Sequence, residues 1–182
     1  MKRFMKVLVL DRDGVINADS PDYIKSPDEW RPLPGSIEAI ARAAKAGFTI
    51  AIASNQSGVG RGLFDLDTLS AIHDTMIETV EAAGGRIDLI VFCPHAPDDA
   101  CDCRKPKAGL FQRIEAELGT SLSGQWAIGD SLRDLEAATA VGATPVLVRT
   151  GNGRRTEKEP GVRDVKVFDD LAAAVDALLE TA

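Results

Sequence analysis

The stretch VLVLDRDG, residues 7–14, decides how this chain folds. Its four consecutive apolar residues are typical of a strand that is buried on both faces of a parallel sheet. The run stops at Asp11, and Asp13 follows two residues later. In sheets of this kind, ligands bind beyond the carboxyl ends of the strands. The stretch therefore predicts a buried strand that leads directly into a functional loop.

The rest of the chain repeats this order of a short apolar run followed by an amphipathic stretch. The predicted strands span residues 5–10, 48–53, 87–92, 126–128 and 145–148, and the predicted helices span 37–44, 69–80, 110–118, 132–141 and 171–179. Strands that alternate with helices favour right-handed crossovers and a parallel sheet covered on both faces. We therefore expect an α/β fold with a doubly wound, Rossmann-like parallel sheet.

Length and charge restrict the class of protein. The 182 residues are 45% apolar, which is enough for one domain over 1–182 with its own core. The net charge of −7 argues against a nucleic-acid or membrane-surface protein, which needs a broad basic patch. The chain starts with basic residues, as a signal peptide does, but the four-residue apolar run is too short for one. We expect a cytoplasmic monomer that acts on a small molecule.

Polar and charged side chains follow each of the first four predicted strands. After Asp11 and Asp13 come SNQSG at 54–58, a loop that ends in two cations, and GDSLRD at 129–134. Clustered carboxylates, including Asp130, call for a hard divalent cation such as Mg²⁺, while a cation and a hydroxyl beside them form a phosphate clamp. Each element alone could be a helix cap or a solvated surface group. Their common place at strand ends favours phosphoryl-transfer chemistry.

All three cysteines lie in one loop, 93–106, together with one of the two histidines. The pattern is C-x-H-x5-C-x-C, formed by Cys93, His95, Cys101 and Cys103. Three thiolates and one imidazole fit a closed, tetrahedral structural Zn²⁺ site. Inert buried thiols are the alternative. Bound zinc would fix the backbone beside the two cations that end the loop.

The ordered segments LDRDGVIN, IASNQSG, CRKPKAG and IGDSLRDLEAA resemble the four motifs of the haloacid dehalogenase (HAD) superfamily of phosphotransferases. The resemblance covers nearly the whole chain. It implies a nucleophile at Asp11, a general acid and base at Asp13, and phosphoryl binding by Ser54 and Lys105. It also implies Mg²⁺ on the carboxylates of Asp11 and Asp130 and on the backbone carbonyl of Asp13.

The zinc loop is similar to that of two phosphatase branches. One removes the 7-phosphate of a heptose 1,7-bisphosphate for bacterial lipopolysaccharide, and the other acts on histidinol phosphate. The segments SNQSGVGRG, SPDEW and VLVRTGNG favour the heptose branch. No long insertion offers a separate cap domain, so 14–34 is expected to act as a flap over the substrate.

The heptose branch implies further substrate contacts, which join Ser54 and Lys105. These are Asp19, Asn55, Gln56, Ser57 and Arg104. Ser131 departs from the pattern, because several members have a lysine there. Asp134 could tune the metal site or only cap its helix, and His73 is expected to be a packed helix histidine.

Two other classes of protein are weaker interpretations. A kinase would need a G-x-x-x-x-G-K-[ST] loop, and SGVGRG has no lysine in that place. A non-catalytic, zinc-dependent interaction module would explain the cysteines but not the acids at the other strand ends. A nucleic-acid 3′-phosphatase shares the chemistry, but the acidic balance of the chain counts against it.

Overall fold

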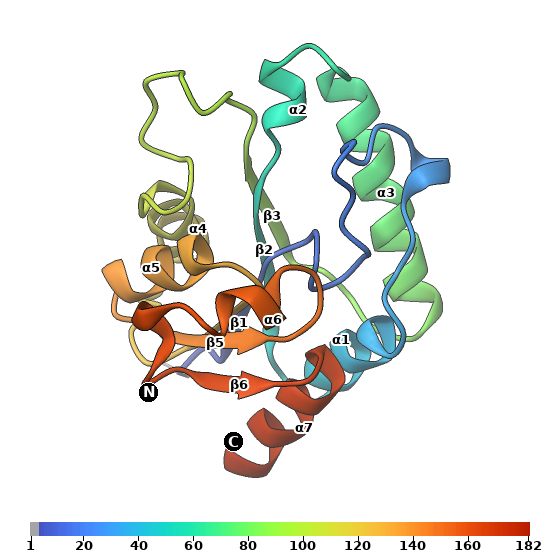
Figure 1. Cartoon of the computed structure of the whole chain (residues 1–182). Helices are drawn as coiled ribbons and strands as arrows, with labels where there is room; N and C mark the ends of the chain where they lie inside the picture. The colour runs from blue at the N-terminus through green and yellow to red at the C-terminus, as the bar shows by residue number, and fades with distance from the viewer. Residues whose placement is uncertain (1–3) are drawn as a thin grey trace.

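Six parallel strands form a single sheet in the order β3-β2-β1-β4-β5-β6 (Figure 1). The computed structural model describes residues 4–182, so the first three residues of the chain lie outside it. The strands are β1 Val7–Leu10, β2 Thr49–Asn55, β3 Leu89–Cys93, β4 Trp126–Gly129, β5 Thr144–Val148 and β6 Lys166–Phe168. The parallel, doubly wound sheet that the sequence predicts is confirmed.

Helices cover both faces of the sheet (Figure 1). On one face lie α1 Ser36–Lys45, α3 Leu66–Ala82 and α7 Leu171–Thr181, and on the other lie α4 Gly109–Leu118 and α5 Leu132–Ala140. Four short turns of helix complete the chain: η1 Pro27–Glu29, α2 Ser57–Gly60, α6 Gly153–Thr156 and η2 Pro160–Val162. Because both faces of the sheet are covered, all four residues of the VLVL run of β1 are apolar. Leu8 and Leu10 pack under α1, α3 and α7, whereas Val7 and Val9 pack under α4.

The strand order changes direction at β1, and this change positions the functional site. From β1 the chain builds β2 and β3 on one side, and then crosses to β4 on the other side of β1. Leu10 is therefore in register with Ile52 on one side and with Ile128 on the other. The loops after β1 and β4 diverge at this point and leave room for a ligand between them.

Residues 14–34, the predicted flap, cross the carboxyl end of the sheet without forming a domain of their own. Apart from η1 and isolated bridges of Asn17 with Asp13 and Pro32, they are irregular. Their apolar side chains are nevertheless part of the core: Val15, Ile16, Ile24 and Trp30. The loop is thus fastened to the sheet at several points along its length.

The structure differs from the predicted elements mainly near the end of the chain. The strand β6 was not predicted, because three residues are too few to show a periodicity.

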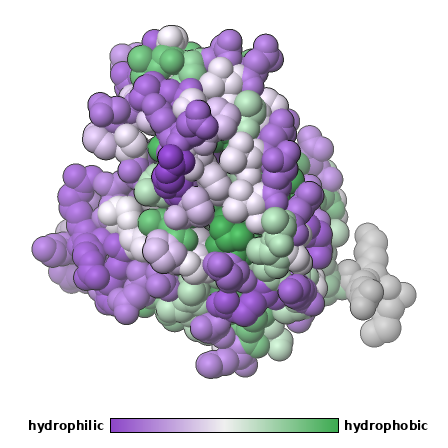
Figure 2. Space-filling model, turned by 90° about the vertical axis from the view of Figure 1, so that its right-hand side faces the viewer, coloured by the Kyte–Doolittle hydropathy of each residue, from purple (hydrophilic) through white to green (hydrophobic). Residues whose placement is uncertain are grey.

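The surface seen from the right of Figure 1 is mostly polar, with apolar residues in small separate areas (Figure 2). Among residues 4–182, no helix combines the length and the apolar character that crossing a membrane requires.

Candidate active site

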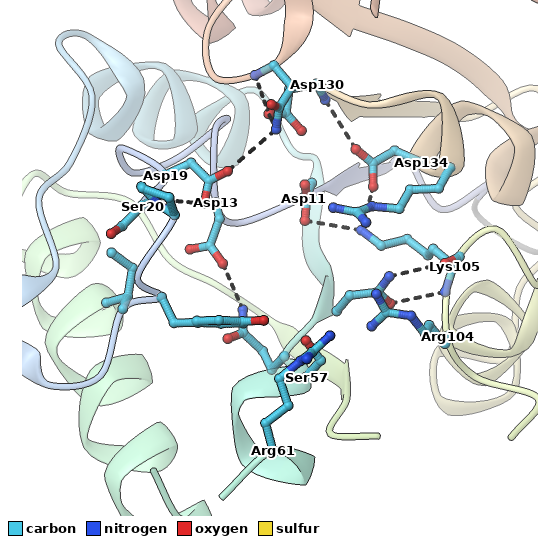
Figure 3. Close-up of a pocket in the computed structure, with 17 residues that line it drawn as sticks. Asp11, Asp13, Asp19, Ser20, Ser57, Arg61, Arg104, Lys105, Asp130 and Asp134 are labelled. Atoms are coloured by element: carbon cyan, nitrogen blue, oxygen red, sulfur yellow. Dashed lines mark hydrogen bonds and ion pairs between the residues drawn. The ribbon is translucent and has the colours of Figure 1, made fainter. Parts of the chain in front are cut away.

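A polar cavity of about 340 Å³ lies at the carboxyl ends of β1, β2 and β4, with part of the flap along one side (Figure 3). Its walls combine five carboxylates with four cations. The acidic side chains are Asp11, Asp13, Asp19, Asp130 and Asp134, and the basic ones are Arg61, Arg104, Lys105 and Arg133. Such a mixture suits an anionic ligand that is bound together with a metal ion.

Asp11 stands at the centre of the site, directly after β1. Its Oδ1 accepts hydrogen bonds from the Arg12 backbone N–H at 2.8 Å and from Lys105 Nζ at 3.1 Å. Burial raises the pKa of Asp11 well above its ordinary value, and the nearby Asp134 carboxylate adds to this effect. The carboxylate is therefore costly to ionise until a cation arrives.

Lys105 is almost fully buried, and three oxygen atoms surround its ammonium group. Besides Asp11, its Nζ lies 2.7 Å from Asp134 Oδ1 and donates to the Ala53 carbonyl at 2.7 Å. Burial alone would lower the pKa of Lys105, but Asp11 and Asp134 outweigh it and raise the pKa above its usual range. The ammonium group is thus charged and fixed in place.

Asn55, at the end of β2, holds the backbone of Lys105. Its Oδ1 accepts from the Lys105 N–H at 3.0 Å, and its Nδ2 donates to the Lys105 carbonyl at 3.1 Å. The side-chain amide of Asn55 therefore pairs with the backbone of Lys105 as a neighbouring strand would, and it links the end of β2 to the cysteine loop. This contact, with the bonds to Nζ, aims the lysine at Asp11.

Asp130 follows β4 and faces Asp11 across a narrow gap. A Cβ atom added to Gly14 or to Gly151 would come within 2.1 or 2.2 Å of Asp130 Oδ2, so both close approaches require glycine. The Asn152 N–H donates to the same oxygen at 2.8 Å. Burial, and then Asp134, raise the pKa of Asp130 to about 7.

These carboxylates fit a divalent cation. One oxygen each of Asp11, Asp130 and Asp134 lie within 4.8 Å of one another. Raised pKa values at Asp11 and Asp130 mean that the two negative charges are poorly compensated by protein groups. Asp134 is engaged elsewhere, because it pairs with Lys105 and caps α5 together with Ser131. It therefore has both a capping role and a charge role.

Asp13 lies in a network that favours its ionised form. Arg12 Nε donates to its Oδ1 at 3.0 Å, as does Asn17 Nδ2 at 2.9 Å, and Gln56 Nε2 donates to Oδ2 at 3.0 Å. Burial would raise the pKa of Asp13, but Arg12 and these hydrogen bonds lower it below its ordinary value.

The four predicted zinc ligands, which are spread over most of the 93–106 loop, meet in one cluster. Cys93 Sγ lies 3.0 Å from Cys103 Sγ and 3.8 Å from Cys101 Sγ, and His95 Nδ1 lies 3.3 Å from Cys103 Sγ. Around a tetrahedral zinc with bonds of about 2.3 Å, sulfur atoms are separated by about 3.8 Å. No disulfide joins the cysteines. The donor set and its clustering within 4.8 Å therefore fit zinc, and the Cys93–Cys101 separation matches that of a tetrahedral site, whereas the Cys93–Cys103 separation is shorter.

Most of the predicted site residues line the cavity, but Ser54 does not. The hydroxyl of Ser54 is buried beneath the wall and accepts from Gln56 Nε2 at 2.6 Å, whereas Ser57 lines the cavity. Sequence reasoning missed Arg12, Asn152 and Arg133. All three stand inside segments that carry the family resemblance, Asn152 in VLVRTGNG, but the sequence pattern gave none of them a role in the site.

The comparisons with known proteins agree with this geometry. A HAD-hydrolase-like family model matches residues 102–174, and a polynucleotide kinase 3 phosphatase model matches residues 6–131. A D-glycero-beta-D-manno-heptose-1,7-bisphosphate 7-phosphatase of Pseudomonas aeruginosa is 57% identical over 96% of this chain and 98% of its own. The chain belongs to the heptose-1,7-bisphosphate 7-phosphatase family of HAD-type phosphatases.

Solved structures of this family have the same fold. The D,D-heptose 1,7-bisphosphate phosphatase of Bordetella bronchiseptica, complexed with magnesium and phosphate, is 51% identical, with a TM-score of 0.95 over 98% of this chain and 100% of that one. The phosphatase from Burkholderia thailandensis is 43% identical, with a TM-score of 0.76 over 96% of this chain and 98% of that one. The family places this chain among the phosphoric monoester hydrolases.

Proposed function

We propose that this protein removes the 7-phosphate of a heptose 1,7-bisphosphate, in the supply of heptose for bacterial lipopolysaccharide. The observation that carries the proposal is the pairing of Asp11 with Lys105 Nζ, at 3.1 Å, on the floor of a cavity with further cations on its walls. One phosphate would meet Asp11, and the other would meet the remaining cations. Histidinol phosphate, the alternative substrate, has only one phosphate to bind.

The first half of the reaction uses Asp11 as the nucleophile. A carboxylate oxygen of Asp11 attacks phosphorus, the bond from phosphorus to the sugar oxygen breaks, and Asp13 gives that oxygen a proton. Lys105 exchanges its bond to Asp11 for one to a phosphoryl oxygen and so holds the charge that moves. Because Asp13 rests as a carboxylate, its proton arrives with the substrate phosphate, whose second pKa is about 6.

The second half returns the enzyme to its starting state. Asp13 takes a proton from water, the water oxygen attacks phosphorus, and the bond to Asp11 breaks to release phosphate. Asp13 then passes its proton to the departing phosphate and is a carboxylate again. The lowered pKa of Asp13 keeps its carboxylate ionised, so an acceptor for the proton of water is present.

Asp11, Asp130 and the backbone carbonyl of Asp13 are the groups proposed to hold catalytic Mg²⁺. When bound, the ion offsets the carboxylate charge and polarises a phosphoryl oxygen. Cys93, His95, Cys101 and Cys103 would hold structural Zn²⁺, which would keep the loop before Lys105 rigid. Asp19, Asn55, Gln56 and Ser57 are proposed to contact or shape the substrate. Ser54 supports that wall through Gln56.

Three arginines are available to the second phosphate: Arg61, Arg104 and Arg133. Among residues 4–182, none of their guanidinium groups forms an ion pair with a carboxylate, although all three line the cavity. An anion that is bound across the cavity from Asp11 can therefore reach them without displacing an acid. Several members of the family have a lysine at the position of Ser131, and in this chain Arg133, two residues later, supplies a cation to the cavity.

A single domain with a flap at 14–34, a monomeric state and a cytoplasmic location remain predictions from the sequence.

The decisive experiment is phosphate release with Mg²⁺ from heptose 1,7-bisphosphate and from histidinol phosphate in parallel. We expect a strong preference for the bisphosphate, with the product keeping the phosphate at position 1. Asp11→Asn should abolish turnover of both, whereas Asp164→Asn, at an exposed carboxylate far along the chain, should have no effect. A preference for histidinol phosphate would overturn the substrate, and an active Asp11→Asn would overturn the mechanism.

A further inference from the structure

A buried arginine stands between the two central acids of the site. Arg12 is the largest fully buried side chain among residues 4–182, with 0% exposure. A guanidinium group keeps its charge under all ordinary conditions, so burying one is costly unless its N–H groups are paired. The partners of Arg12 therefore show what the fold gains from its burial.

On one side, the guanidinium group of Arg12 forms a bidentate contact with the carboxylate of Asp13. Its Nε donates to Asp13 Oδ1 at 3.0 Å, and its Nη2 donates to Oδ2 at 3.2 Å. This two-point contact fixes the rotation of the carboxylate as well as its position. The Asp13 side chain is 23% exposed and faces the cavity, so the arginine holds it from behind.

On the other side, Arg12 is itself held by two neutral groups. Its Nη2 donates to Gln56 Oε1 at 3.2 Å, and its Nη1 lies 3.3 Å from His73 Nε2. Because guanidinium nitrogens only donate, His73 Nε2 must accept, and its ring proton is on Nδ1. The His73 ring packs at a tilt against Phe92, with the ring centroids 5.8 Å apart.

We infer that Arg12 is a positioning residue, which His73 and Gln56 hold in place so that it fixes the carboxylate of Asp13. The inference rests on the proposed role of Asp13. That role needs one carboxylate to reach two different oxygen atoms in turn, first that of the leaving sugar and then that of the attacking water. A misplacement of about 1 Å can cost about 100-fold in rate, so rotation about the last side-chain bond must be restrained.

The direct test is steady-state kinetics of the Mg²⁺-loaded protein with heptose 1,7-bisphosphate. Arg12→Lys keeps the charge but offers one point of contact in place of a fork. We expect kcat to fall about 10- to 100-fold while KM stays within about threefold, since Arg12 does not line the cavity. An unchanged kcat, or a change in KM alone, would overturn the inference.

Variants of His73 test the same network without touching a residue of the site. His73→Leu removes the acceptor for Arg12 Nη1, whereas His73→Gln offers an amide oxygen in its place. We expect His73→Leu to lower kcat about 5- to 10-fold and His73→Gln to recover it to within about threefold of the parent. This pair also decides the matter if the Arg12 variants do not fold.

A packing control separates positioning from general loss of stability. Met76 is fully buried one turn further along α3. Met76→Ala should lower the thermal midpoint and leave kcat of the folded protein unchanged. If His73→Leu and His73→Gln both behave like Met76→Ala, His73 only packs and the network has no role in positioning.

Asp13→Asn distinguishes a failure of this inference from a failure of the proposed mechanism. If Asp13→Asn keeps its turnover, the acid and base role of Asp13 is wrong, and the inference falls with it. If Asp13→Asn is inactive while Arg12→Lys is fully active, only the inference is wrong.

Discussion

At the scale of single residues, the site is a set of charges that the fold leaves incompletely balanced. Burial is the main cause of the raised pKa values of Asp11 and Asp130, whereas Arg12 lowers the pKa of Asp13 and Lys105 lowers that of Asp134. The four acids of the site are thus of two kinds. The first pair is proposed to hold a metal ion, whereas in the second pair Asp13 is held by Arg12 and Asp134 holds Lys105.

The raised pKa of Asp130 predicts how metal binding and stability depend on pH. Between its ordinary value of 3.8 and about 7, the folded protein keeps a proton on Asp130 that the unfolded chain has lost. The stability that this carboxyl contributes therefore falls as the pH rises through that range. Mg²⁺ takes the place of the proton, so its stabilising effect should be greater at about pH 8 than at about pH 5.

Thermal unfolding with and without Mg²⁺ at the two pH values measures this difference. Asp130→Asn should remove most of the response to Mg²⁺, while Asp164→Asn should keep it. An equal Mg²⁺ shift at both pH values would mean that Asp130 does not have to lose a proton when the metal binds.

The sequence predicted most residues of the site because parallel strands bring their carboxyl ends to one edge. It did not reveal the roles of residues whose neighbours are distant in sequence. Arg12 was given no role, because its partners Gln56 and His73 lie after β2 and in α3, far from it in the sequence. Ser54 reads as a hydroxyl at a strand end, yet the inward pleat at that position buries it.

At the scale of elements, the cysteine loop and the end of β2 form one unit behind Lys105. The Gln56 N–H donates to the Cys93 carbonyl at 2.8 Å, and the Gly60 N–H donates to the Pro94 carbonyl at 2.8 Å. A Cβ at Gly60 would come within 2.7 Å of that carbonyl oxygen, so α2 sits tightly against the loop. The sequence predicted that the cysteines and His95 of this loop would cluster, but not the contact of the loop with α2, because four residues are too few to reveal a helix.

Loss of one cysteine should therefore weaken catalysis from a distance. We expect Cys101→Ala to release zinc and to lower phosphatase activity about 10-fold or more, because a loosened loop no longer aims Lys105. Metal analysis and phosphate release measure the two effects on the same sample. Asp98→Asn, an exposed change in the same loop, should retain both zinc and activity. A zinc-free protein with full activity would contradict the role of the loop.

At the scale of the whole molecule, the active site lies where the two halves of the sheet meet, with β2 and β3 on one side of β1 and β4, β5 and β6 on the other. The loop after β1 and the loop after β5 meet there, since Thr150 Oγ1 donates to the Gly14 carbonyl at 2.6 Å. Asp130 fills the space between them. The site thus depends on residues from both ends of the chain, and the change of direction in the strand order at β1 brings them together.

Two glycines with nearly equal φ angles allow the contact between the loops after β1 and β5 to be tested. Gly151 has a φ of +55° and Gly119 a φ of +61°, but a Cβ at Gly119 would meet nothing within 4 Å. Gly119→Ala should therefore cost only the backbone strain, about 1 kcal/mol of unfolding free energy, with activity unchanged. Gly151→Ala bears the same strain and also drives a methyl group into Asp130 Oδ2 and Gly14 Cα. It should raise the Mg²⁺ concentration needed for half-maximal activity, a change that strain alone does not produce. If both variants lose stability equally and respond equally to Mg²⁺, the contact of the two loops does not hold the metal site.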